Sequence, residues 1–259
     1  MDGKKLVPAV VLLLAAAFAR TAPAYVEILD PRPLEKETRE ELILRMTAKS
    51  LNRQYEETFA AAEKAAPASW FSVDIKAACT INIFSSAGET CPVNYPFMPT
   101  GKQTYYGVPL EIVAPADNAN RTAIALPSNR LLPGKLAPTA EVPVGRTASV
   151  LYVLVSTYYT SNKGTQYFQM NYEDGSTERM KFIGTVHSGD WYHDTTRIHS
   201  EDVRYVLVPA AKDTKTFFRN MHLVQWKNPH PAKKIRSLTF ASDPAADMGV
   251  FIVAVTGLP

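Results

Sequence analysis

The chain downstream of Pro67 consists of short apolar runs, rich in Val, Ile, Tyr, Phe and Thr, that are separated by clusters of Gly, Pro, Asn and Asp. Such runs, bounded by turn residues, are typical of antiparallel strands in a sandwich or barrel. Asp174 and Gly175 predict the tight turn of a hairpin. The pattern predicts strands at 71–75, 110–113, 123–125, 141–144, 149–156, 167–172, 177–183, 203–209, 217–226, 235–241 and 251–256.

The segment 34–66 has a different composition, dominated by Glu, Lys, Arg, Ala and Leu without Gly or Pro, and predicts a long amphipathic helix that Pro67 ends. We expect its apolar stripe to pack onto the sandwich or onto a neighbouring copy of the chain; a coiled-coil partner helix is the alternative. The stripe consists of Leu44, Ala48, Leu51, Tyr55, Phe59 and Ala62.

Residues 1–24 are typical of a secretory signal peptide, with Lys4 and Lys5 before an apolar run and small residues up to Ala24. The apolar run extends from Leu6 to Ala19 and is shorter than the roughly 20 residues that a membrane-spanning helix needs. We expect cleavage after Ala24 and a secreted or extracytoplasmic protein that does not span the membrane after cleavage. An uncleaved membrane anchor is the alternative.

Export also bears on the cysteines and on the charge of the mature chain. Cys79 and Cys91 predict a disulfide that closes a short loop, and two buried free thiols are the alternative. Without residues 1–24, Lys+Arg falls from 28 by 3 to 25 and Asp+Glu falls from 25 by 1 to 24. This near-neutral balance argues against a nucleic-acid partner, which requires a clustered basic face.

Several segments resemble, in order, the jelly-roll domains attached to secreted bacterial glycoside hydrolases and related polysaccharide-processing proteins. The resemblance spans residues 70–257 and rests on TGKQTYYGVPLEIVAP (100–115), the strand at 122–126, LYVLVSTYY (151–159), MNYEDGSTERM (170–180), SGDWYHD (188–194) and WKNPHPAKKIRSLTFAS (226–242). Ser156 and Thr157 depart from the family, which has His and a small residue there, and Tyr192 replaces a second Trp.

The resemblance implies a galactose-binding-like fold, common among carbohydrate-binding modules, and no catalytic domain accompanies it here. We therefore predict a mainly β protein: an antiparallel jelly-roll β-sandwich preceded by a signal peptide and one long α-helix. The expected organisation is signal peptide 1–24, N-terminal extension 25–67 with the amphipathic helix, and jelly-roll domain 68–259. Fold likeness supports function by analogy alone.

Catalytic and metal-binding motifs of known spacing are absent from the sequence, so we predict a non-enzyme without a cofactor. The carboxylate pairs Glu173–Asp174 and Glu201–Asp202 are read as a hairpin turn and a polar connection rather than as glycosidase residues. A structural calcium ion is possible, although no ligand set identifies its site. One stretch of the chain holds three histidines and two aspartates, which could bind a transition metal. We interpret it instead as a polar loop whose histidines face solvent or serve as hydrogen-bond partners. Its residues are His187, Asp190, His193, Asp194 and His199.

A sugar site is predicted at the loop formed by Asp190, Trp191, Tyr192 and His193. Aromatic rings stack on the C–H face of a pyranose, and neighbouring acids and amides bind its hydroxyls. In the alternative, one ring of each aromatic pair fills the core while its neighbour points outward. The predicted site also includes the pair Tyr158 and Tyr159.

The Trp226–Pro231 motif is read as structural, with Trp226 buried beside a proline-containing turn, and Asn120 begins a glycosylation sequon. The leading hypothesis is a secreted, non-catalytic module that binds carbohydrate or a cell-surface glycan. The first alternative is a structural or protein-interaction module that associates through the N-terminal helix. A divergent glycan-processing enzyme is the third hypothesis.

Overall fold

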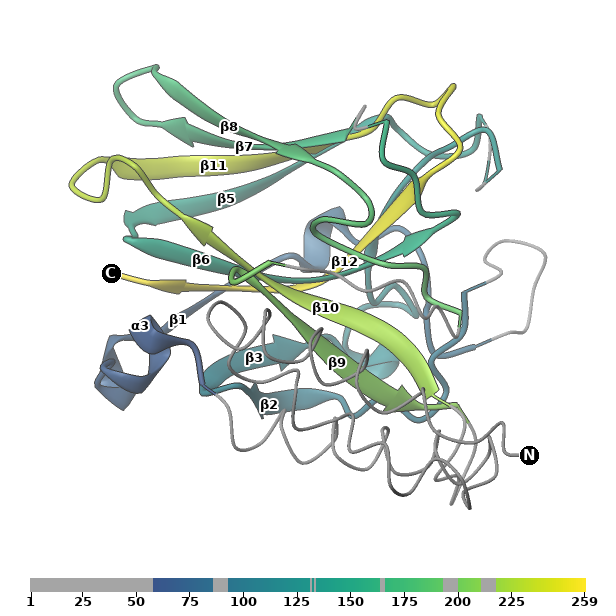
Figure 1. Cartoon of the computed structure of the whole chain (residues 1–259), viewed down its shortest axis with the longest axis horizontal. Helices are drawn as coiled ribbons and strands as arrows, with labels where there is room; N and C mark the ends of the chain where they lie inside the picture. The colour runs from purple at the N-terminus through teal and green to yellow at the C-terminus, as the bar shows by residue number, and fades with distance from the viewer. Residues whose placement is uncertain are drawn as a thin grey trace, which may run out of the picture. The chain divides into compact units, whose positions relative to one another are not determined.

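The computed structural model describes residues 58–85, 93–130, 132, 134–163, 166–192, 200–210 and 218–259, and this part of the chain is mainly β (Figure 1). In chain order the elements are α3 (Ala60–Glu63), η1 (Pro67–Ser69), β1 (Phe71–Val73), η2 (Lys76–Ala78), β2 (Gly101–Tyr105), β3 (Val108–Ile112), η3 (Pro115–Asp117), β4 (Ile124–Leu126), β5 (Thr139–Thr147), β6 (Val150–Tyr158), β7 (Gln166–Tyr172), β8 (Thr177–Phe182), β9 (Val203–Pro209), β10 (Phe218–Lys227), β11 (Lys234–Ala241) and β12 (Gly249–Leu258).

Two antiparallel sheets form the predicted β-sandwich. The larger has the order β1-β12-β6-β10-β9, with β4 also paired to β12, and the smaller has the order β5-β11-β7-β8. Apolar side chains of both sheets share one core cluster, which includes Val153 of β6, Phe168 of β7 and Phe240 of β11. The two sheets therefore pack face to face, as they lie in Figure 1.

The opposite face of the larger sheet is also covered. Tyr152 and Leu154 of β6 belong to a second core cluster together with the β2–β3 hairpin and α3. Successive strand residues point to opposite faces, so a central strand with two covered faces requires apolar residues at nearly every position. The runs LYVLV in β6 and VFIVAV in β12 meet this requirement, and both strands are almost wholly buried.

The predicted strands all have counterparts, with bounds that differ by a few residues. The predicted hairpin is confirmed: β7 pairs with β8, and Gly175 takes a φ of 85° in the turn, a conformation that glycine adopts without steric cost. One strand, β2, was not predicted, because its sequence GKQTY carries no apolar run. It pairs with β3 and forms part of the layer over the second cluster.

The predicted helix can be compared with the structure only at its end, because residues 34–57, including Leu44, Ala48, Leu51 and Tyr55, lie outside the described residues. There the prediction of a continuous helix is wrong: Phe59 is extended, and α3 has only four residues. Phe59 is instead buried against Tyr106 and Tyr152, at ring distances of 6.4 and 5.1 Å. Ala62 is buried beside it, so the β core extends N-terminal to residue 68.

The predicted signal peptide and the predicted Cys79–Cys91 disulfide both include residues that the structure does not describe. The signal peptide, residues 1–24, lies outside the described residues. In the described part of the chain, no helix is long and apolar enough to cross a membrane. Cys79 is buried and forms no disulfide with any residue that the structure describes; its thiol donates to the carbonyl of Ile75, and burial raises the pKa of this thiol to about 12. Cys91 lies outside the described residues, so the predicted disulfide stays a prediction.

Gly257 of β12 is required by the way β1 packs. A Cβ atom at this position would meet the ring of Phe71 at 2.1 Å, so Phe71 lies directly on the glycine backbone. We expect Gly257→Ala to lower the free energy of unfolding by about 1–3 kcal/mol, because the added methyl group overpacks this contact. Denaturant unfolding measures the change, and the double variant Phe71→Leu/Gly257→Ala should recover part of it. A loss that the second substitution deepens would contradict this packing.

Candidate functional site: an aromatic patch held by Asp190

The predicted sugar loop bridges two strands of the larger sheet. The amide of Trp191 donates to the carbonyl of Thr157 at the end of β6, at 2.8 Å. The amide of Asn220 at the start of β10 donates to the carbonyl of Trp191, at 3.0 Å. These bonds place residues 190–192 beside Tyr158 and Tyr159, which directly follow Thr157, so the structure brings both predicted aromatic pairs together.

Asp190 holds the two parts of this surface through one carboxylate. Its Oδ2 accepts the amide of Tyr159 at 2.8 Å, and its Oδ1 accepts the amide of Tyr192 at 2.9 Å. Tyr159 has a φ of 54°, in the left-handed region that is costly for a non-glycine residue. A charge-assisted hydrogen bond to its amide stabilises that backbone conformation. The Asp190 patch is defined as Asp190, Tyr158, Tyr159, Trp191, Tyr192, Arg130 and Arg219.

The rings of the patch divide into buried and exposed members. Trp191 is 8% exposed and packs against Tyr95, with ring centroids 6.1 Å apart, whereas Tyr192 is 53% exposed. Tyr158 is half-buried and meets the 46%-exposed ring of Tyr159 edge to face, at 4.7 Å. The alternative in which one ring of each pair fills the core therefore describes Trp191 and Tyr192 well. It leaves two exposed tyrosine rings on one surface.

Two arginines complete the patch. Arg219 lies over the rings of Trp191 and Tyr192, 4.7 and 4.2 Å from their centroids, and Arg130 lies 4.6 Å from the centroid of Tyr159. Arg130 also donates to Asp247 at 3.1 Å. That hydrogen bond, with a second from Asn129, lowers the pKa of the Asp247 carboxyl. Guanidinium groups on aromatic faces hold their N–H donors in a fixed plane beside the rings.

Buried polar groups support the patch from below. The hydroxyl of Tyr95 lies 2.7 Å from the carbonyl oxygen of Asn220, to which it donates, and 2.9 Å from the hydroxyl oxygen of Ser156. Thr157 donates from its hydroxyl to the carbonyl of Gly189 at 2.7 Å. Because these bonds lie in the interior, they fix the loop on the ends of β6 and β10. Ser156 and Thr157, where the sequence departs from the resembled family, therefore have structural roles here.

The predicted histidine cluster is described only in part, because His193, Asp194 and His199 lie outside the described residues. His187 serves as a hydrogen-bond partner: its Nδ1 accepts the amide of Ile183 at 2.9 Å, and its ring stacks on Phe182. Burial lowers the pKa of His187 below its usual value of 6.5. Within the described ranges, no group of three or more His, Cys, Asp or Glu side chains could hold a metal ion.

The depressed pKa of His187 predicts a pH dependence of stability. The unfolded chain binds a proton at this histidine near pH 6.5, whereas the folded chain binds it only at lower pH. The free energy of unfolding should therefore fall as the pH drops below about 6.5. Thermal unfolding between pH 7.5 and 5 measures the effect, and His187→Asn, which keeps an acceptor for Ile183, should flatten the profile. The exposed His230→Asn variant is the control; equal slopes in all three proteins would contradict the assignment.

Glu173, Asp174 and Asp202 of the two carboxylate pairs each contact a lysine. Glu173 contacts Lys234 at 2.6 Å, and Asp174 contacts Lys233 at 2.8 Å in the turn between β7 and β8. The hydrogen bond from Lys233, followed by those from Ser176, holds the pKa of Asp174 well below its usual range. In the second pair, Asp202 contacts Lys227 at 2.8 Å. These contacts fit the structural roles that were predicted for both pairs.

The residues of the Trp226–Pro231 motif have structural contacts. Trp226 is buried, and its ring lies 6.3 Å from that of Phe168 in the smaller sheet. Asn228 donates to the carbonyl of Ala148 at 2.7 Å and accepts the hydroxyl of Tyr172 at 2.6 Å. The motif therefore fastens the end of β10 to both sheets, in line with the structural interpretation of the sequence.

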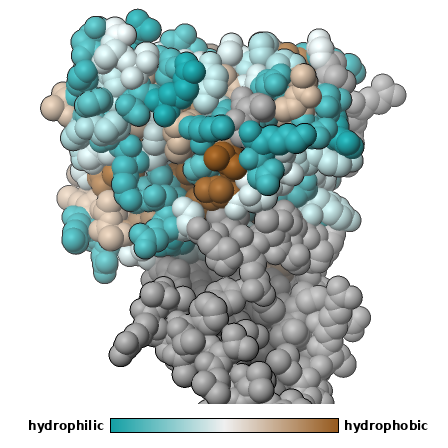
Figure 2. Space-filling model, turned by 45° about the horizontal axis from the view of Figure 1, so that its top comes forward, coloured by the Kyte–Doolittle hydropathy of each residue, from teal (hydrophilic) through white to brown (hydrophobic). Residues whose placement is uncertain are grey.

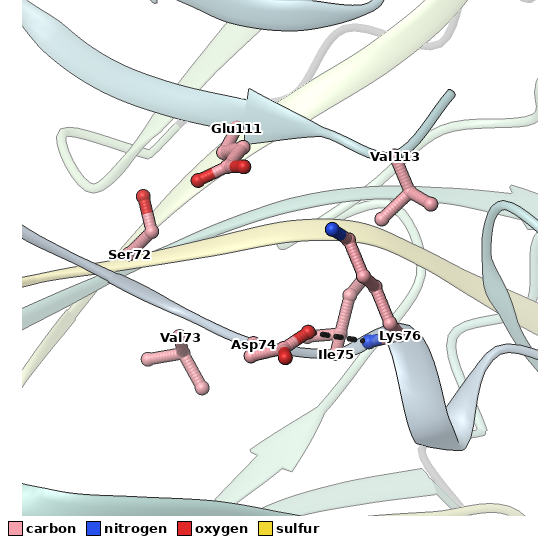
Figure 3. Close-up of a pocket in the computed structure, with 7 residues that line it drawn as sticks. All are labelled: Ser72, Val73, Asp74, Ile75, Lys76, Glu111 and Val113. Atoms are coloured by element: carbon pink, nitrogen blue, oxygen red, sulfur yellow. Dashed lines mark hydrogen bonds between the residues drawn. The ribbon is translucent and has the colours of Figure 1, made fainter. Parts of the chain in front are cut away.

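A second concave surface, absent from the sequence predictions, runs along β1. Its larger part has a volume of about 350 Å³. The smaller part, of about 180 Å³, is shown in Figure 3, where the side chains of Glu111 and Lys76 come from β3 and from η2. The residues lining the larger part are Pro67, Trp70, Phe71, Ser72, Lys102, Gln103, Thr104, Pro109, Leu110 and Thr256.

No sequence signal marked this groove, because its walls come from β1 and from the β2–β3 hairpin, some 30 residues apart in the chain. Comparison of the chain with protein-family models, with curated proteins and with solved structures finds no match. The likeness of its segments to jelly-roll domains is therefore carried by the motifs of the sequence alone.

Proposed function

We propose that this protein is a secreted, non-catalytic carbohydrate-binding module of the galactose-binding-like jelly-roll class, and that the Asp190 patch is its glycan site. The observation that carries the proposal is the arrangement around one carboxylate. Asp190 fixes the backbone of both Tyr159 and Tyr192, the two exposed rings of the patch. Rigid, exposed aromatic rings beside hydrogen-bonding groups are the combination that sugar binding requires.

The arginines supply the polar half of such a site. Arg130 and Arg219 lie against the exposed rings. The terminal N–H groups of the half-exposed Arg130 are directional donors for sugar hydroxyl oxygens, whereas Nε and Nη1 of Arg219 are buried. The contacts with aromatic faces and with Asp247 restrict their rotamers before a ligand arrives. Less conformational entropy is then lost on binding, which favours recognition of a weakly bound polar ligand.

The polarity of the described surface favours a polar ligand over a large apolar partner. The coloured residues on the face drawn in Figure 2 are mostly hydrophilic, and the hydrophobic area among them is small. Large exposed apolar patches mark protein interfaces, so this face offers little for such a contact. Glu173, Asp174 and Asp202 are held by lysines, which supports a binding role over a hydrolytic one.

A polysaccharide and oligosaccharide array tests the proposal. We expect the purified protein to bind a restricted set of glycans and the double variant Tyr159→Ala/Tyr192→Ala to lose that binding. Phe97→Ala is the matched control, since it removes an exposed ring outside the patch. Circular dichroism confirms that each variant is folded. If the double variant bound the same glycans as the parent protein, the patch would not be the site.

A further inference from the structure

The groove along β1 lies at the other end of the larger sheet from the Asp190 patch. Along β12, Gly249 pairs with Tyr158 at the patch, whereas Thr256 lines the groove. These positions are seven residues apart, which corresponds to about 20 Å in a strand. A ligand in the groove is therefore separate from a ligand on the patch.

The packing around β1 fixes the aromatic wall of this groove. Trp70 is half-buried and its ring lies 5.6 Å from that of Tyr152 in the second core cluster. The next residue, Phe71, lies on the backbone of Gly257 in β12. Thr256 donates its hydroxyl to the carbonyl of Pro109 at 2.7 Å, which ties β12 to the opposite wall. These contacts fix the described walls of the groove relative to one another.

The polar groups of the groove are available to a ligand. The side chains of Ser72, Lys102 and Thr104 line it, and none of them is hydrogen-bonded to another residue that the structure describes. The side-chain amide of Gln103 donates from its Nε2 to the carbonyl of Thr100, at 2.9 Å, and this bond fixes the orientation of the side chain. Hydroxyl, amide and ammonium groups beside an indole ring match the hydroxyls and the C–H face of a sugar.

We infer that the groove is a second carbohydrate site, which takes a short stretch of an oligosaccharide chain. This inference rests on the proposed function, since it assigns the same ligand class to a second place. The larger part of the groove alone, about 350 Å³, is within the range of small-ligand sites, and the adjoining part beside Glu111 extends it. A peptide ligand fits less well, because the apolar side chains of β1, Phe71 and Val73, are already buried.

Two sites at opposite ends of one rigid sheet make the protein bivalent. A single long polysaccharide could then be held at two places, or two chains could be cross-linked. The second contact on an already bound polysaccharide occurs at high effective concentration, so two weak sites together retain a polysaccharide more strongly than either site alone.

Calorimetric titration with hexasaccharides of glucose, galactose, mannose and xylose tests the inference. We expect two equivalents to bind the parent protein and one to bind Thr104→Arg, which fills the groove from its exposed rim and weakens that site at least tenfold. Thr177→Arg, a matched change at an exposed position of β8, should still bind two. In a Trp191→Phe background, the bound sugar should change the fluorescence of Trp70 but not that of the buried Trp226.

The outcomes separate this inference from the proposed function. Binding of the same number of equivalents, with the same affinities, by the parent protein and by Thr104→Arg would overturn the groove and leave the patch in place. Binding that Thr104→Arg removes and Tyr192→Ala leaves unchanged would support the groove and overturn the patch. Absence of binding by all four hexasaccharides and by the array would overturn both. Binding of an extended peptide, but of no sugar, in the groove would also overturn the inference.

Discussion

Replacing Asp190 with alanine is expected to weaken glycan binding by more than about tenfold, a loss of over 1.4 kcal/mol of binding free energy. The carboxylate accepts the amides of Tyr159 and Tyr192, and each charge-assisted hydrogen bond contributes about 1.5–3 kcal/mol. Without it, the left-handed conformation of Tyr159 loses its support, and the two exposed rings are no longer held on one surface. Titration with a glycan that the array identifies measures the loss.

Asp190→Asn provides the matched comparison. An amide oxygen can still accept one main-chain N–H, but the amide nitrogen faces the other N–H as a second donor. We therefore expect an affinity between those of the parent protein and Asp190→Ala. If the charge of Asp190, rather than its hydrogen bonds to two backbone amides, determined binding, Asp190→Asn and Asp190→Ala would be equally weak. Equal affinity in all three proteins would remove Asp190 from the site.

Replacing Phe168 with alanine is expected to lower the free energy of unfolding by about 3–5 kcal/mol. Its ring is fully buried between the sheets, 4.6 Å from Phe182 and 4.9 Å from Phe240. Across the core it faces Trp226 of the larger sheet, so its removal leaves a cavity between the two layers. The melting temperature should fall by about 10 °C, measured by calorimetry.

Phe97→Ala is the control for the stability prediction. This ring is 42% exposed, so its removal should cost less than about 1 kcal/mol. A similar loss in both variants would mean that Phe168 is not at the centre of the sandwich. Phe168 belongs to the core cluster between the two sheets, whereas Trp191 and Tyr158 of the patch pack in the second cluster. Folded Phe168→Ala protein should therefore retain glycan binding below its melting temperature.

The strands could be predicted from the sequence because each forms a short run of β-branched and aromatic residues ended by turn residues, as in β7, β8 and their Asp174–Gly175 turn. The layer that covers the outer face of the larger sheet, over the second core cluster, could not be predicted in the same way. Its members, Phe59, the polar strand β2 and the segment around Tyr95, carry little periodic signal. The evidence for that layer lay elsewhere, in the unbroken apolar runs of β6 and β12, which indicate strands that are covered on both faces.

The candidate site was predicted in part. Trp191, Tyr192 and Asp190 adjoin in the sequence, and Tyr158–Tyr159 form a conspicuous second pair, so their residue types alone suggested a shared surface. Arg130, Asp247 and Arg219 could not be assigned to it, because they come from positions up to 117 residues apart and are brought together by the sheet. The hydrogen bond from the amide of Tyr159 to Asp190 likewise joins distant positions, and no local pattern encodes it.

The most direct test of the central claim is the amide ¹H–¹⁵N NMR spectrum of the protein titrated with a soluble glycan from the array. The proposed site predicts that the amides of Tyr159 and Tyr192, both hydrogen-bonded to Asp190, shift early in the titration together with neighbouring residues of the patch. The second site predicts a separate set of shifts at Ser72 and Thr104. Shifts confined to residues outside both surfaces, or none at all, would contradict the account.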